Sequence, residues 1–235
     1  MHTSTRKKLG WLAAGSAISL AAGAIGLPAA SAAPRQLDVT GFTIKDMVFS
    51  SSSCQYNNVT VRGKVAGSVT DFYIDADVTR SGALVDWAIF DDSDAKDRLF
   101  ICDTDGLGAY KVGPSEVSGF TSDYDYFDYT DYSATTFYVR GKTRSGLSSS
   151  RKGKVVTLNL SASYFNPAAS KYSALNAKGV KIQRKTSKGW VTIKTVNLSK
   201  GKSSFKYTQK AKASYRAVIS QTSKTTAATS TTVKR

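Results

Sequence analysis

Few residues in this sequence can support nucleophilic or metal-assisted catalysis. The only histidine is His2, and the only cysteines are Cys54 and Cys102. Because His2 lies in a segment that we expect to be removed on export, the mature chain lacks the base of Ser-His-Asp and Cys-His sites and the imidazole ligands of zinc sites. A Gly-x-Ser-x-Gly elbow, a Walker loop and a dinucleotide-binding fingerprint are missing from the sequence as well.

Two catalytic routes remain open. One is a pair of carboxylates, as in glycoside hydrolysis, and the other is a lysine with a lowered pKa. Acidic residues occur only before residue 132, Glu116 is the only glutamate, and most aspartates stand among Ser, Gly and Thr, which is typical of solvated turns. We therefore expect a protein that is not an enzyme, and an aspartate-based glycoside hydrolase is the alternative.

Two short aspartate-rich segments have the composition of calcium-binding loops, since hard cations prefer several oxygen ligands on a bent backbone. Their acidic residues are Asp91, Asp92, Asp94, Asp103 and Asp105. Neither segment has EF-hand spacing, so we expect hairpin loops in which aspartates cap their own turns. We predict no cofactor, and a calcium-stabilised adhesion module stays open as an alternative.

Acidic and aromatic residues alternate over residues 121–132. The tyrosines of this segment are Tyr124, Tyr126, Tyr129 and Tyr132. Exposed tyrosines beside carboxylates suit a stacked sugar or a cationic partner. Two alternatives stay open: a loop folded on its own domain with Tyr inward and Asp outward, and a loop that docks on the basic part of the same chain or of a neighbour.

Charge divides the chain into two parts. Residues 33–131 contain 17 acidic and 8 basic residues, whereas residues 132–235 contain 22 basic residues and no acidic one. A sheet face that carries many cations without acids predicts contact with a polyanion, here an anionic cell-envelope polymer or an acidic glycan. The residues predicted to make that contact are Lys181, Arg184, Lys185, Lys188, Lys194, Lys206 and Arg216. Aromatics are not regularly interleaved among them, so specific nucleic-acid recognition is not predicted.

The first 32 residues have the pattern of a secretory signal peptide. Arg6, Lys7 and Lys8 precede an apolar run, and Ala30-Ser31-Ala32 provides a small-x-small cleavage site. We therefore expect a secreted protein, extracellular or associated with the cell wall, with no transmembrane segment in the mature chain. Because the outside of a cell is oxidising, Cys54 and Cys102 are predicted to form a disulfide. The sequence makes no prediction of the oligomeric state.

The elements that position these residues are predicted to be strands. Val, Ile, Thr, Tyr and Phe dominate the regular stretches, and Gly and Ser interrupt them at short intervals. The fold class is therefore all-β: two Ig-like antiparallel β-sandwich domains in tandem after the signal peptide. The predicted division is a signal peptide (1–32), an acidic domain with the disulfide (33–144), a Gly/Ser/basic linker (145–153) and a basic domain (154–235).

The basic domain also resembles a known family. Residues 179–185, the Gly189-Trp190-Val191 turn, a Gly-Lys turn before Phe205 and Tyr215-Arg216-Ala217 are similar to the Ig-like β-sandwich modules of secreted and wall-associated bacterial proteins. The resemblance covers residues 154–235 only, and the loop 166–178 is longer and more basic than the family pattern. It implies a spacer or a binding surface rather than a catalyst.

Overall fold

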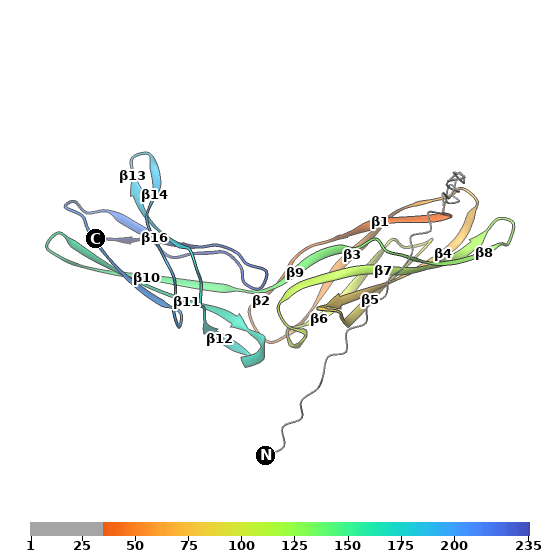
Figure 1. Ribbon diagram of the computed structural model, residues 1–235, viewed down its shortest axis with the longest axis horizontal. Helices are drawn as coiled ribbons and strands as arrows, with labels where there is room; N and C mark the ends of the chain where they lie inside the picture. Colours follow the sequence, from red (N-terminus) through yellow and green to blue (C-terminus); the bar gives the residue numbers. More distant parts are fainter. Residues whose placement is uncertain (1–34) are drawn as a thin grey trace, which may run out of the picture. The chain divides into compact units, whose positions relative to one another are not determined.

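The computed structural model describes residues 35–235 (Figure 1). The predicted signal peptide lies outside the described residues. The regular structure of residues 35–235 consists of β-strands and two 3₁₀ turns, η1 (Asp103–Asp105) and η2 (Pro167–Ala169). The all-β fold class is therefore confirmed. In this part of the chain, no helix has the length and apolar character needed to cross a bilayer.

The first half of the chain folds into two facing sheets. Sheet A has the strand order β1 (Leu37–Ile44), β3 (Cys54–Val65), β6 (Lys96–Cys102). Sheet B has the order β2 (Met47–Phe49), β9 (Thr135–Gly141), β7 (Gly108–Thr121), β4 (Val69–Arg80), β5 (Ala83–Asp91), and β8 (Tyr126–Asp131) also pairs with β7. The pairing in both sheets is antiparallel except between β2 and β9, which run parallel at one edge of sheet B.

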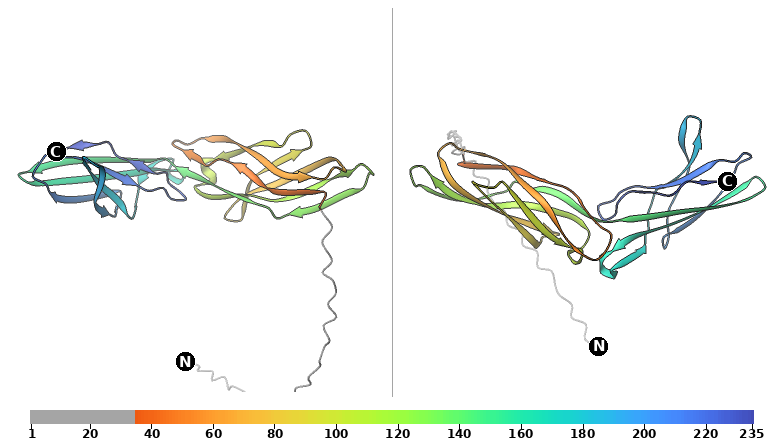
Figure 2. Two further views of the ribbon diagram at one scale, coloured as in Figure 1. Left: turned by 90° about the horizontal axis from the view of Figure 1, so that it is seen from above. Right: turned by 180° about the vertical axis from the view of Figure 1, so that it is seen from behind.

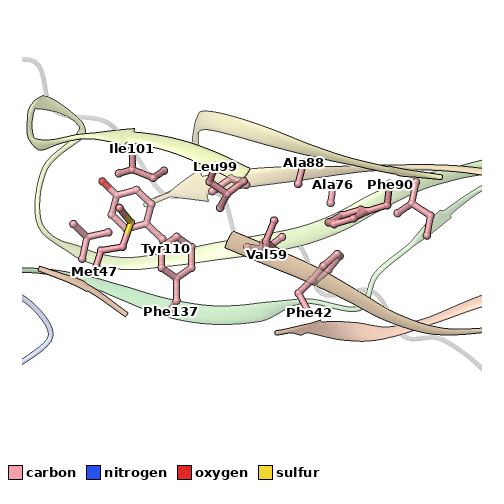
Figure 3. Packing of buried hydrophobic residues seen from close by; sticks show 14 of the residues in the cluster. Phe42, Met47, Val59, Ala76, Ala88, Phe90, Leu99, Ile101, Tyr110 and Phe137 are labelled. Carbon is pink, nitrogen blue, oxygen red and sulfur yellow. The ribbon is translucent and has the colours of Figure 1, made fainter. Parts of the chain in front are cut away.

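One hydrophobic core lies between sheets A and B (Figure 3). Alternate residues of each strand point into it, as the period of two in a pleated strand requires. Phe42 and Phe90 meet across the core with ring centroids 5.9 Å apart, and Tyr110 and Phe137 meet at 5.4 Å. Each large apolar side chain buried in this way contributes about 1.5–3 kcal/mol.

The second half of the chain forms another pair of sheets around its own core. Sheet C contains β10 (Thr143–Lys152), β11 (Val155–Asn166), β12 (Lys171–Ala174) and β15 (Lys202–Thr208). Sheet D contains β14 (Gly189–Val196), β13 (Val180–Thr186), β16 (Ser214–Ile219), β17 (Ala228–Thr229) and β18 (Val233–Lys234). Leu158, Ile182 and Tyr215 are among the residues buried between these sheets.

The structure corrects the prediction of a linker at residues 145–153. Residues 143–152 form β10, which pairs with β11 along its full length. Leu147 is buried in the second core, so this Ser-rich stretch has an inward face that its composition concealed. Only Lys142 separates β9 from β10, and Phe165 of β11 packs into the first core. The division into two domains stays a prediction.

Two further expectations about irregular segments are corrected. Residues 126–131, expected in a loop, form β8, because β7 continues far enough to pair with them. The Thr-rich strand expected over residues 225–233 is reduced to the short strands β17 and β18. The long loop after β11 contains η2 and β12.

Candidate functional site

The predicted disulfide is present. Cys54 and Cys102 lie directly opposite each other on β3 and β6, with Cα atoms 3.9 Å apart. Beside the disulfide, Tyr56 and Phe100 form an exposed aromatic pair with ring centroids 5.0 Å apart, and the Arg98 guanidinium lies 5.1 Å from the Tyr56 centroid. The disulfide therefore fastens the end of sheet A and leaves no free thiol in residues 35–235.

The aspartates proposed as calcium ligands cap backbone turns. The Asp91 carboxylate accepts hydrogen bonds from the Ser93 N–H and hydroxyl and from the Asp94 N–H, at 2.6–2.9 Å. These bonds, the Ser93 hydroxyl first, lower the pKa of Asp91 below its ordinary value. Asp105 accepts the Cys102 N–H at 2.7 Å.

The remaining aspartates of this set do not come together as one ligand group. Asp94 accepts the Lys96 N–H at 2.8 Å, Asp103 is buried, and Asp92 is exposed. Within residues 35–235 no group of three or more His, Cys, Asp or Glu side chains is placed to hold a metal ion. Calcium binding stays a prediction.

The four tyrosines of residues 121–132 do not form one site. Tyr129 points inward: its hydroxyl accepts the Leu37 N–H at 3.0 Å and donates to the Leu37 carbonyl, and burial raises its pKa. Tyr126 points outward and packs against Phe120, with ring centroids 5.2 Å apart. Tyr124 and Tyr132 are 89% and 77% exposed and lie at opposite ends of β8.

The predicted polyanion-binding residues are distributed over more than one surface. Lys181, Lys185 and Arg216 lie on the outer face of sheet D, where cross-strand pairing places Arg216 beside Gln183 and Lys185 beside Trp190. The Trp190 ring has the Arg216 guanidinium 4.3 Å and the Lys185 ammonium 5.6 Å from its centroid. Arg216 also donates to the Gln183 amide oxygen at 2.8 Å. We call the surface formed by Lys181, Gln183, Lys185, Trp190 and Arg216 the basic face.

The other four predicted cations lie elsewhere. Arg184 donates to the Gln209 side chain at 2.6 Å and to the Tyr207 hydroxyl at 3.2 Å, so it joins the two sheets. Lys206 belongs to β15 of sheet C, and Lys188 lies in the turn between β13 and β14. Lys194 pairs with Ile182, whose side chain faces the core.

A β-bulge explains the misplacement of Lys194. The pairing of β13 with β14 shifts by one residue between Ile182 and Gln183, and such a shift changes the face on which the following side chains lie. The hairpin of β13 and β14 also projects beyond the neighbouring strands (Figure 1, Figure 2). Val191 is therefore 48% exposed near the tip of the hairpin.

A second charged surface, which we did not predict, covers the outer face of sheet B. Cross-strand pairs place Asp77 beside Trp87, Asp75 beside Ile89 and Tyr73 beside Asp91. On the other side of β4, Glu116 lies opposite Asp75. We call the surface formed by Tyr73, Asp75, Asp77, Trp87, Ile89 and Glu116 the aromatic–acidic face.

The carboxylates of this face lie close to one another and form no ion pair with a cation of the described residues. Desolvation, and then the neighbouring Asp77 and Glu116, raise the pKa of Asp75 above its ordinary value of 3.8. The two ion pairs found in residues 35–235 are Arg35–Asp131 at 2.8 Å and Arg140–Asp46 at 2.5 Å, and neither involves this face. A cationic partner would therefore be favoured here.

A shallow depression of about 650 Å³ lies over sheet C. It is lined by backbone and small polar side chains, including Ser148, Asn159 and Ser204, together with Lys202. Hydroxyl and amide groups with one cation can form hydrogen bonds to a polar polymer. None of the residues predicted from the sequence lines this depression.

Comparisons with known proteins find likeness in structure only. No protein-family model and no curated protein matches the chain. The D00-D0 domain of intimin matches 84% of this chain and 98% of its own, with 13% identity and a TM-score of 0.28. An apo structure of Bacteroides uniformis β-glucuronidase 3 matches with 9% identity and a TM-score of 0.26, and a Parabacteroides merdae β-glucuronidase with 8% and 0.26.

The extent of the overlap differs between these structures. The two glucuronidase matches cover 82% and 85% of this chain but only 24% and 25% of the enzymes. The chain thus spans about a quarter of either enzyme. At these TM-scores none of the three likenesses supports an inference about function.

Proposed function

We propose that this protein is an exported binding protein without catalytic activity, and that its basic face attaches it to an anionic polymer of the cell envelope or to an acidic glycan. One observation carries the proposal. From residue 132 onward the chain has 22 basic and no acidic residues, and among them only Arg140 is ion-paired in the described part of the chain. Cations without acidic neighbours attract a polyanion without competition from internal ion pairs.

The basic face has the geometry for this role. Lys181, Lys185 and Arg216 lie on one open sheet surface, so a linear polymer can contact all three at once. Trp190 lies between two of the cations and offers a flat ring beside them, which suits the apolar side of a sugar. The ligand class therefore follows from the charge, and the preference for a glycan follows from the aromatic ring.

The test measures binding of the mature chain to heparin, polyphosphate and isolated cell walls at increasing salt. The variant Lys181→Gln/Lys185→Gln/Arg216→Gln should bind more weakly, and the slope of log affinity against log salt should fall by about three, one for each lost contact. The matched control is Lys152→Gln/Lys171→Gln/Lys210→Gln, which removes three exposed cations elsewhere. Equal losses in both variants, or binding that salt does not weaken, would overturn the proposal.

The alternative of a carboxylate-based glycosidase has one candidate pair. Asp75 and Glu116 lie opposite each other, and burial, followed by the charges of Asp77 and Glu116, raises the pKa of Asp75, which is the direction that favours a general acid. Both side chains are exposed on a sheet face, so a bound sugar would remain in contact with water. Turnover of a polysaccharide that is abolished by Glu116→Gln would favour the enzyme, whereas a panel without turnover supports the binding role.

The calcium alternative has a simple test of its own. A ligand that binds only the folded state raises the melting temperature, and the stabilisation grows with the logarithm of the ligand concentration relative to its Kd. A melting temperature that rises in millimolar calcium and falls in chelator would support a calcium-stabilised module. The same melting temperature in both would count against it.

A further inference from the structure

We propose that the aromatic–acidic face of one copy of this chain binds the basic face of a second copy, so that chains associate head to tail. This inference goes beyond attachment to a polymer, because it assigns a partner to the aromatic–acidic face; the second copy and the polymer would then compete for the basic face. It rests on the exposed apolar area of sheet B, on its unpaired carboxylates and on the complementary composition of sheet D.

The aromatic–acidic face exposes a contiguous group of apolar side chains. Tyr73, Trp87 and Ile89 are 59%, 56% and 47% exposed, and they belong to the paired strands β4 and β5. Phe120 and Tyr126, 42% and 59% exposed, extend the same face onto β7 and β8. Single exposed apolar residues are ordinary, but a contiguous group on one sheet face is typical of an interaction site.

The charges of this face select a cationic partner. Asp75, Asp77 and Glu116 are exposed, adjacent and without an ion pair, so each raises the energy of the others. Lys111 lies near one end of the face, opposite Thr79, and it is the one cation on β4, β5, β7 or β8 whose side chain points outward. Cations from a partner would remove this repulsion and would also pack over the exposed aromatic rings.

The basic face supplies matching groups. Its cations surround Trp190, and Val218 lies beside Lys181 on the same side of the sheet. Both faces therefore have an aromatic centre with charges of one sign around it. Two such sheets can stack at the usual separation of about 10 Å, with Arg216 placed against the partner's tryptophan.

A second copy is favoured over another basic protein, because this chain carries both complementary faces and is always present at its own concentration. No ion pair joins the two faces within residues 35–235, so each remains available. The two faces are different surfaces, so the contact is heterologous, and heterologous contacts extend into rings or filaments unless one face is blocked.

The experiment uses the mature chain in analytical ultracentrifugation at low and high salt. The wild type should form oligomers that grow with concentration and dissociate in salt. The variants Asp75→Lys/Asp77→Lys and Lys185→Glu/Arg216→Glu should each be monomeric. Their equimolar mixture should associate again, because the intact basic face of the first variant fits the intact aromatic–acidic face of the second, and the two charge-reversed faces are also opposite in sign. This recovery would also show that both variants are folded.

The matched control Asp92→Lys/Lys206→Glu makes the same kind of change at exposed positions outside both faces and should assemble like the wild type. A monomeric wild type at low salt, oligomers in either variant alone, or a mixture that stays monomeric would overturn the proposal. Binding of another basic protein to a wild type that remains monomeric would overturn it too. The variant Asp75→Lys/Asp77→Lys keeps the basic face, so its binding to heparin reports on the proposed function separately.

Discussion

The two halves of the molecule use charge in opposite ways to satisfy their backbones. In sheets A and B, carboxylates accept backbone N–H groups: Asp97 accepts from Ile89 at 2.9 Å, and Asp86 accepts from Phe100 at 2.6 Å. In sheets C and D, where acids are missing from the sequence, guanidinium groups donate to backbone carbonyls. Arg151 donates to the carbonyls of Gln209, Ala211 and Arg235 at 2.7–3.1 Å.

This comparison separates charges that stabilise the fold from charges that are free to bind. Asp86, Asp97 and Arg151 have partners within the chain and are partly buried. Asp77, Lys181 and Lys185 are exposed and unpaired in the described structure. A count of charged residues therefore overestimates both binding surfaces, because many of the counted charges already have partners within the chain.

The largest expected effect is the loss of stability when the disulfide is removed. The disulfide joins residues separated by 48 positions in the sequence, and only the first half has one. Removing it with Cys54→Ala/Cys102→Ala should cost about 4 kcal/mol of unfolding free energy, since the unfolded chain regains the entropy of the open loop.

Tryptophan fluorescence can show which half of the molecule loses stability, because the described residues contain Trp87 in the first half and Trp190 in the second. In Trp190→Phe the transition reported by Trp87 should shift by the full amount. In Trp87→Phe the transition reported by Trp190 should shift less if the halves are separate domains. Equal shifts would show that residues 35–235 unfold as one cooperative unit.

An intermediate effect is expected at Arg151. Its guanidinium holds three carbonyls near the C-terminus, and Arg235 in turn donates to the Ser149 carbonyl at 2.9 Å. Arg151→Ala should destabilise the protein by about 2–3 kcal/mol, because hydrogen bonds from a charged donor are lost and the partly buried Gln209 carbonyl loses this donor.

The matched comparison for Arg151→Ala is Lys181→Ala on the basic face. An exposed lysine without partners should change the unfolding free energy by less than about 0.5 kcal/mol. Arg151→Lys should not restore stability, because one ammonium cannot reproduce the planar fork of the guanidinium. Similar unfolding free energies for the alanine variants, from urea titration, would remove the distinction between structural and free cations.

Period-two alternation predicts much of this fold but not its surfaces. Strands in which buried and exposed residues alternate, such as β4 and β16, are the kind that this pattern predicts. The strand β10 was missed because its inward positions include Ser145 and Ser149, which gave it the composition of a linker. Composition alone cannot show that serines lie between two sheets.

The aromatic–acidic face was missed for a related reason. In β5 both alternating sets are apolar: Ala88 and Phe90 on one side, Trp87 and Ile89 on the other. The sequence does not decide which set is buried, and only the pairing with β4 places Trp87 beside Asp77. Likewise, the bulge that moves Lys194 away from the basic face comes from the pairing of two strands rather than from either strand alone.

The smallest effect has the opposite sign and concerns Asp75. Its pKa in the folded state lies above the ordinary 3.8, so the folded chain binds this proton more tightly than the unfolded chain. The resulting stabilisation is fully present below pH 3.8 and is lost as the pH rises through the folded-state pKa. At pH 7, Asp75→Asn should therefore melt slightly higher than the wild type, and at pH 3 the difference should vanish.

Scanning calorimetry of monomeric protein in moderate salt checks this, with Asp92→Asn as the control for the loss of one exposed negative charge. A lower melting temperature for Asp75→Asn at pH 7 would mean that an unrecognised cation already pairs with Asp75. Under conditions in which chains associate, the sign should reverse, because the partner's lysine or arginine then stabilises the ionised carboxylate. The same substitution would weaken the assembly while it stabilises the monomer, which is the behaviour expected of a charge kept unpaired for a partner.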